Sequence, residues 1–234
     1  MSKIYVALEY NDKGFTAFAE NYPGASGRGK TKDEALSKLP KEVDRYMNWL
    51  NDTPSQDYSI EIREEYECSL NVEDADSDII FKSETQPLDY SDYQRLKAIA
   101  LKSATDFEKL YNSIPDINLP LREPRKCFYG DVPVTARNMY NHTKNVNSYY
   151  FGELGITIGN GTYIRNSRMA GFLGLEGIDG FLRMPSTIGA YNEEWSVRKL
   201  LRRFLWHDLI HAKAMYRGAV NVFGKNKVAN PFKF

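Results

Sequence analysis

The sequence predicts an α+β protein in which a small ββαβ sheet domain is followed by an up-down four-helix bundle. Residues 1–70 combine short alternating apolar runs with one amphipathic stretch, whereas residues 90–234 carry helical periodicity interrupted by prolines and glycines. The charge changes near the same position: residues 1–90 hold 10 Lys and Arg against 19 Asp and Glu, and residues 91–234 hold 21 against 12. We therefore expect two domains, at 1–70 and 90–234, joined by an acidic linker at 71–89.

The first domain is expected to contain a hairpin, a helix and a final strand. Thr31 and Glu34 match a capping box, in which each side chain accepts from the other's backbone N–H, so a helix should begin there. Within the linker, the apolar residues 79–81 are a candidate edge strand for the same sheet. The expected elements are strands at 4–8 and 15–19, a loop at 23–29, a helix from 31 to about 50 and a strand at 58–68.

The second domain is expected to hold four helices. A proline-rich stretch at 115–124 ends the first helix, and four glycines between 168 and 182 weaken the prediction of the third. Glu193 and Glu194 suit the first turn of the last helix. Four basic residues that follow are interpreted as its solvated face: Arg198, Lys199, Arg202 and Arg203. The expected helices are at 91 to about 113, 133 to about 154, 168–182 and 195–217.

The three histidines of the chain are candidate metal ligands. His207 and His211 lie one helical turn apart on an apolar stripe, and His142 is placed among apolar neighbours in the second helix. Two imidazoles facing a core are costly unless they are hydrogen-bonded or bound to a metal. We therefore predict one metal site made by His142, His207 and His211. The alternative is that these are core histidines bonded to backbone carbonyls.

The segment from His207 to His211 also resembles HExxH, the helical zinc motif of metalloproteases, with Asp208 in place of the glutamate. Aspartate is one methylene shorter, so its carboxylate is badly placed to reach a metal-bound water. No Asp, Glu or His follows His211, so the downstream third ligand of such proteases is missing. We therefore do not expect a protease, and Asp208 is interpreted as a surface residue or as a residue that contacts the ligands.

The composition also indicates in which compartment the protein works and which kinds of partner it has. No apolar run approaches the roughly 20 residues of a membrane span, and the N-terminus lacks a signal-peptide pattern. Cys68 and Cys127 lie far apart and form no CxxC motif, which is typical of a reduced, cytoplasmic protein. The acidic first half is a poor binder of nucleic acid, because phosphate backbones require cations. We expect a small-molecule substrate, no membrane partner and no nucleic acid, with a homo-oligomer as a further candidate assembly.

The first domain resembles the N-terminal domain of the HicB antitoxin family. The residues that carry the resemblance are Gly14-Phe15-Thr16-Ala17-Phe18, Tyr22-Pro23-Gly24-Ala25 and Gly29-Lys30-Thr31-Lys32-Asp33-Glu34-Ala35-Leu36. It covers about residues 1–66, and Ala25 stands where the family often has cysteine. No short DNA-binding segment follows. The resemblance therefore implies a small sheet with one helix and a role in protein contacts or in shielding, rather than transcriptional repression.

The second domain resembles the DinB-like (YfiT-like) family over about residues 90–220. The resemblance rests on His142 and on the segment Trp195 to Arg203 leading into His207-x-x-x-His211. It implies a four-helix bundle with a metal site whose ligands are His142, His207 and His211. Many members have Glu where Asp208 stands, which leaves any role of that carboxylate open.

A three-histidine site with an open position is typical of catalysis. The resemblance implies thiol-dependent transfer, with a low-molecular-weight thiol as substrate, or a related metal-dependent hydrolysis. We expect a divalent metal, with zinc or nickel favoured and iron or manganese as further candidates. No acid or base is identified, and Asn145, Tyr149 and Tyr150 are either pocket-lining or structural residues. The alternative is a non-catalytic binding or regulatory protein that uses the acidic first domain for protein contacts and carries a structural or vestigial metal site.

Overall fold

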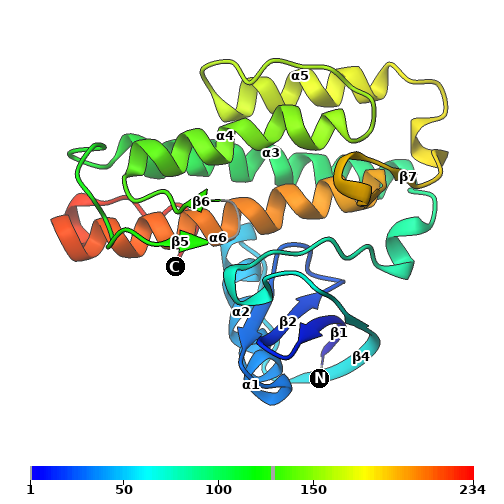
Figure 1. The fold of residues 1–234 in the computed structure, drawn as a ribbon, viewed down its shortest axis with the longest axis horizontal. Coiled ribbons are helices and arrows are strands. Elements are labelled where there is room, and N and C mark those ends of the chain that lie inside the picture. The colour runs from blue at the N-terminus through cyan, green and yellow to red at the C-terminus, as the bar shows by residue number, and fades with distance from the viewer. Residues whose placement is uncertain (1, 128–129) are drawn as a thin grey trace. The chain divides into compact units, whose positions relative to one another are not determined.

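The computed structural model describes residues 2–127 and 130–234 and divides the chain into two compact units (Figure 1). The first unit extends to Phe81, and the second runs from Lys82 to Phe232. The first is built on a four-stranded sheet and the second on helices, so the predicted α+β class is confirmed at this level. None of the described helices is both long and apolar enough to cross a membrane.

The sheet of the first unit has the strand order β3-β2-β1-β4. The first three strands are antiparallel neighbours, whereas β4 pairs with β1 in parallel, with a register shift between Val6 and Ala7. A parallel pair needs a crossover connection, which two helices provide here. The elements in chain order are β1 (Ser2–Asn11), β2 (Gly14–Ala19), β3 (Ser26–Gly29), α1 (Lys32–Ser37), α2 (Leu39–Leu50), β4 (Tyr58–Glu67) and the 3-10 turn η1 (Val72–Asp74).

Strand β3 occupies part of the stretch that was predicted to be a loop, and this is a correction. Its glycines are there for close packing: a Cβ on Gly27 would lie 2.3 Å from the Ala35 carbonyl oxygen, and one on Gly29 would lie 2.6 Å from the Glu34 Cβ. Strand β3 therefore approaches α1 at a distance that only glycine permits. Because glycine also favours turns, its composition alone suggested a loop.

The single helix predicted for residues 31–50 is divided in two. Pro40 has no N–H to continue the helical hydrogen bonds, and α1 ends at Ser37 while α2 begins at Leu39. The predicted capping box is half formed. Thr31 accepts from the Glu34 N–H at 3.2 Å, but the Glu34 carboxylate accepts from Lys30 at 2.8 Å rather than from Thr31.

The proposed edge strand at 79–81 is absent, and this is also a correction. Residues 79–81 have no strand conformation, yet Ile79 and Phe81 are buried, and the Phe81 ring lies 5.8 Å from that of Phe18. Val72, in η1, is buried as well. These apolar side chains thus contribute to the core of the first unit through packing, without joining its hydrogen-bond ladder.

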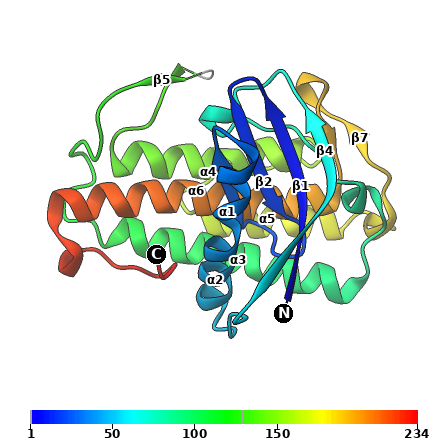
Figure 2. The same ribbon diagram turned by 90° about the horizontal axis from the view of Figure 1, so that it is seen from below.

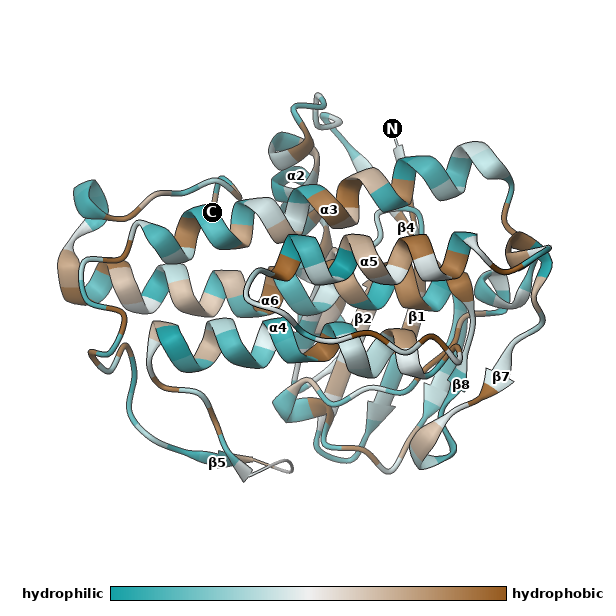
Figure 3. Cartoon of the chain, turned by 90° about the horizontal axis from the view of Figure 1, so that it is seen from above, coloured by the Kyte–Doolittle hydropathy of each residue, from teal (hydrophilic) through white to brown (hydrophobic). Residues whose placement is uncertain are grey.

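The second unit contains four long helices that pack on one another. Helix α3 contacts α4, α5 and α6, and α4 contacts α5 and α6; Figure 2 shows α6 running alongside α3 and α4. Apolar and polar residues alternate along these helices, as expected of amphipathic packing (Figure 3). The long helices are α3 (Tyr90–Asn112), α4 (Ala136–Gly152), α5 (Ile164–Glu176) and α6 (Val197–Phe223).

The boundaries of these helices differ from the predicted ones, and short elements lie between and beside them. The third helix begins and ends earlier than the predicted 168–182, and the last continues beyond the predicted 217. The first is capped by Asp89, whose carboxylate accepts from the Asp92 N–H. The remaining elements are η2 (Lys82–Thr85), β5 (Lys126–Cys127), β6 (Gly130–Asp131), η3 (Phe181–Arg183), β7 (Thr187–Ile188), η4 (Ala190–Asn192), β8 (Glu194–Trp195) and η5 (Lys225–Lys227).

Candidate metal centre

Helix α6 carries two of the candidate ligands on its buried face. Ser196 caps the helix by accepting from the Lys199 N–H at 3.1 Å, which starts the helical register. From there the apolar stripe follows at helical spacing, with Leu200, Phe204 and Met215 fully buried. His207 is 7 % exposed and His211 is partly exposed. The prediction that both imidazoles share the inward stripe is confirmed.

The third histidine meets the other two. His142 lies in α4 and is half-buried. Its ring centroid lies 5.1 Å from that of His207 and 4.6 Å from that of His211, and the latter two are 4.3 Å apart. One nitrogen from each ring lies within 4.8 Å of the others. The structure describes no other group of three or more His, Cys, Asp or Glu side chains with this spacing in residues 2–127 and 130–234.

The spacing of the nitrogens suits a shared ion. The Nε2 atoms of His142 and His207 are 3.2 Å apart. Two nitrogens bound at 2.0–2.1 Å to one tetrahedral ion would be separated by about 3.3 Å. The other nitrogen of His207, Nδ1, is buried and has no hydrogen-bond partner in the described structure. His207 is therefore not a core histidine held by a backbone carbonyl, and three imidazoles that could hold a metal fit the donor set of a divalent cation.

Burial favours the neutral form of two of these imidazoles, those of His142 and His207. Desolvation lowers the pKa of His142, and the Arg122 guanidinium adds to the effect. For His207, desolvation lowers the pKa well below its usual value, and the neighbouring His211, His142 and Arg203 act in the same direction. A neutral imidazole is the form that binds a metal, since protons and metal ions compete for the same lone pair.

The three residues of α4 that were either pocket-lining or structural candidates lie in different environments. Tyr150 is buried, and its ring packs edge-on against the imidazole of His207, with 6.1 Å between the two ring centroids. Tyr149 instead donates from its hydroxyl to Glu193 at 3.3 Å. Asn145 is exposed. Of the three, only Tyr150 lies against a candidate ligand.

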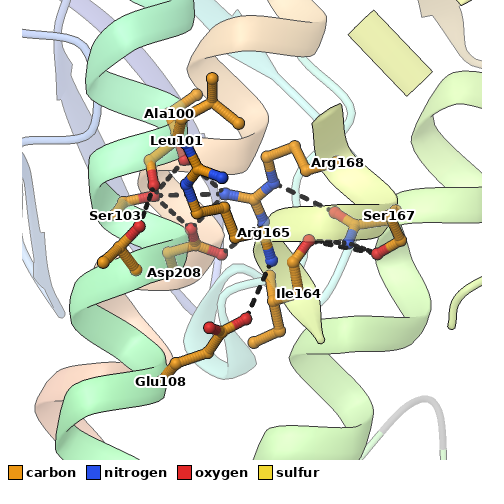
Figure 4. A network of polar contacts seen from close by, with 11 residues as sticks. Ala100, Leu101, Ser103, Glu108, Ile164, Arg165, Ser167, Arg168 and Asp208 are labelled. Carbon is orange, nitrogen blue, oxygen red and sulfur yellow. Dashed lines mark hydrogen bonds and ion pairs between the residues drawn. The ribbon is translucent and has the colours of Figure 1, made fainter. Parts of the chain in front are cut away.

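Asp208 is neither at the surface nor directed at the histidines. Its side chain is fully buried, and Arg168 of α5 binds both carboxylate oxygens, at 2.6 Å and 3.0 Å (Figure 4). Ser103 of α3 donates to the same carboxylate. The surface interpretation is therefore wrong, and a carboxylate held in this way cannot serve as the base of an HExxH protease. No sequence signal indicated Arg168, because a single arginine in a glycine-rich stretch resembles a solvated residue.

The basic residues at the start of α6 were predicted to be solvated, and three of the four are buried. Lys199 forms an ion pair with Glu193 at 2.9 Å. The Arg202 guanidinium donates two hydrogen bonds to the Glu84 carboxylate, from Nε to Oε1 at 2.5 Å and from Nη2 to Oε2 at 3.0 Å. The Arg203 guanidinium lies 5.0–5.8 Å from the ring centroids of Tyr150, Trp195 and Trp206.

The acidic residues before α6 do not lie in its first turn. Helix α6 begins at Val197, while Glu193 precedes β8 and Glu194 lies within it. Glu193 instead accepts from Tyr149 and pairs with Lys199. The expectation that these carboxylates occupy the first turn of α6 is therefore wrong, and Glu193 reaches Lys199 through a side-chain ion pair instead.

Comparison with known proteins identifies no relative. No family model matches the chain, and no curated protein or solved structure matches it significantly.

Proposed function

We propose that the second unit is a metal-dependent enzyme that holds a divalent cation on His142, His207 and His211. The observation that supports this most directly is the convergence of three buried or half-buried imidazoles from two helices, with two Nε2 atoms 3.2 Å apart. Imidazole suits zinc, nickel and iron, and zinc or nickel is the metal we favour. Three protein ligands leave a position open for a substrate or water, as catalytic rather than structural zinc sites do.

The reaction class that we propose is thiol-dependent transfer to a small electrophile, or a related metal-dependent hydrolysis. Both follow from the resemblance of residues 90–220 to the DinB-like family, of which the second unit would be a divergent member with an up-down bundle. A bound divalent cation lowers the pKa of a coordinated thiol or water and so supplies a nucleophile near neutral pH. Imidazole ligands contribute no negative charge to weaken that effect, and the Tyr150 ring packs edge-on against His207.

For the first unit we propose a HicB-like domain that makes protein contacts. The order of its elements, three antiparallel strands, a helical crossover and a parallel fourth strand, supports a compact sheet domain with one helical layer. No catalytic role is proposed for it.

Metal content and activity of two variants test the proposed enzyme. The purified protein should carry about one equivalent of metal, and His142→Ala should lose it, because two imidazoles on one helix bind a cation far more weakly than three. Conjugation of a simple thiol to a model electrophile should depend on the metal and disappear in His142→Ala. Lys32→Ala, on α1 of the first unit, serves as the control.

The result also separates catalysis from a structural role. A structural metal site predicts that chelation lowers the unfolding temperature of the protein while no thiol conjugation or hydrolysis is found with any substrate. Wild-type protein that binds no metal after exposure to zinc or nickel would contradict the proposal outright.

A further inference from the structure

A buried polar network in the second unit surrounds Arg168. Its guanidinium donates to both oxygens of Asp208, and its Nη1 also donates to the Ala100 carbonyl at 2.9 Å and to Ser103 at 3.2 Å (Figure 4). Its Nε donates to Asn147 Oδ1 at 3.1 Å. Arg168, Asp208, Ser103 and Asn147, here named the Arg168 network, are each buried.

The Arg168 network joins the two helices that carry the candidate ligands. Asn147 lies on α4, five residues after His142, and Asp208 lies on α6 between His207 and His211. Arg168 belongs to α5, which carries none of the three histidines, and one guanidinium binds both partners. The amide of Asn147 is itself held in place, because its Nδ2 donates to the Ile164 carbonyl at 3.0 Å and to Ser167 at 2.7 Å.

The contact with α6 extends over two successive turns. Besides binding Asp208, the Arg168 guanidinium lies 4.2 Å from the ring centroid of Phe204, one turn earlier on the same face. A contact at a single point would leave α6 able to rotate about it or to slide. Two contacts one turn apart resist both movements, and the planar fork of arginine adds a defined orientation that a lysine would not give.

Stability does not explain this arrangement. Removing two charges from water costs several kcal/mol per ion, and replacing a buried ion pair by apolar side chains of similar volume is often neutral or stabilising. The best-attested use of such a pair is to fix the register of the elements that it joins. Here those elements are α4 and α6, and their register decides whether three imidazoles can reach one ion.

We propose that Arg168 is a positioning residue for the metal site. Through Asp208 and Asn147 it sets α6 against α4 and so holds His142, His207 and His211 in metal-binding geometry. This inference rests on the proposed function, since it supposes that the three histidines bind a metal.

Cobalt binding tests the inference, because Co²⁺ replaces other divalent ions and its visible absorption reports the coordination geometry. The test variant is the double substitution Arg168→Met/Asp208→Leu, which removes both charges and leaves no unpaired ion. We expect its affinity for Co²⁺ to fall 10- to 100-fold, as when groups that support metal ligands are removed, and its absorption spectrum to change. The unfolding temperature in the presence of chelator should stay close to that of the wild type.

The matched control is Arg202→Met/Glu84→Leu, which removes a second buried arginine–carboxylate pair on α6. The two hydrogen bonds of that pair join α6 to η2, which carries no candidate ligand, so we expect wild-type affinity and a wild-type spectrum. If the double test variant does not fold, Arg168→Lys keeps the charge but loses the fork. We expect it to bind Co²⁺ more weakly than the wild type and with an altered spectrum.

Two outcomes would overturn the inference alone: wild-type Co²⁺ affinity and spectrum in the folded test variants, or an equal loss in the Arg202→Met/Glu84→Leu control. Wild-type protein that binds neither Co²⁺ nor Zn²⁺ would instead overturn the proposed function, and this inference with it.

Discussion

At the scale of single residues, burial changes what the basic side chains of α6 do. Lys199 is fully buried, and desolvation lowers its pKa to about 8 even though the nearby Glu193 acts in the opposite direction. The Lys199 ammonium also donates to the Glu194 carbonyl at 2.7 Å and lies 5.0 Å from the Trp195 ring centroid. A charge in this position needs all of these partners, because an unpaired buried ion is very costly.

The lowered pKa of Lys199 predicts a specific dependence of stability on pH. Below pH 8 the folded and unfolded chains both hold the proton, and the folded state bears the cost of the buried charge. Between pH 8 and the usual value of 10.5 the folded state has lost the proton and the unfolded state has not, so the contribution of Lys199 to stability rises with pH. The free energy of unfolding of the wild type, minus that of Lys199→Met, should therefore increase by up to about 3 kcal/mol over this interval.

Denaturant unfolding of both proteins at several pH values from 7 to 10.5 measures that difference. Lys225→Met, which changes an exposed lysine, is the control and should show no such increase. A flat difference for Lys199→Met, or one that falls as the pH rises, would contradict the prediction.

At the scale of elements, close packing of α5 explains its glycines. A Cβ on Gly171 would lie 2.1 Å from the Phe151 ring of α4, and one on Gly174 would lie 2.7 Å from Ile156. Both Phe151 and Ile156 are buried, so neither can move aside cheaply. The glycines that weaken α5 as an isolated helix therefore let it lie close to α4, where Arg168 reaches Asn147.

This packing predicts different effects on stability for two glycine substitutions. Gly171→Ala should lower the free energy of unfolding by about 1–3 kcal/mol, because the added methyl overpacks the contact between α4 and α5. Gly152→Ala, in the last position of α4, is the matched control: no atom lies within 4 Å of its added Cβ. It should be neutral or stabilising by up to about 1 kcal/mol. Thermal and denaturant unfolding compare the two, and equal effects would exclude the packing explanation.

At the scale of the whole molecule, the candidate chemistry is confined to one unit. Each unit has its own buried apolar core, and all three histidines belong to the second. His142 precedes His207 by 65 positions and lies on another helix, so a bound metal would link α4 to α6 within that unit. The metal would stabilise the folded second unit, because the unfolded chain holds no preformed site.

Hydrogen exchange with and without zinc tests this confinement. At a free zinc concentration 100-fold above the dissociation constant, binding adds about 2.7 kcal/mol to stability, so the slowest amides of α4 and α6 should exchange about 100-fold more slowly. The strands β1 to β4 provide an internal control and should keep their exchange rates. Unchanged rates in α4 and α6, under conditions where metal binding is measured, would contradict the prediction.

Local patterns in the sequence were sufficient to predict the α+β division, the approximate helices and the proximity of the three histidine side chains. Helical spacing and caps such as Ser196 depend on residues within a few positions, so His207 and His211 could be placed on the inward face of α6. The pairing of the two with His142 was also predictable, because the chain holds no fourth histidine.

Only the tertiary structure decided which polar groups are buried and what they bind. Arg168 meets Asp208 across 40 positions and Arg202 meets Glu84 across 118, and neither pairing has a local signature. Glycine was ambiguous for a related reason: Gly27 and Gly171 mark close approaches between elements, although the same residue type also marks turns. Periodicity is a property of neighbouring residues, whereas the partners of a buried charge depend on how whole helices pack.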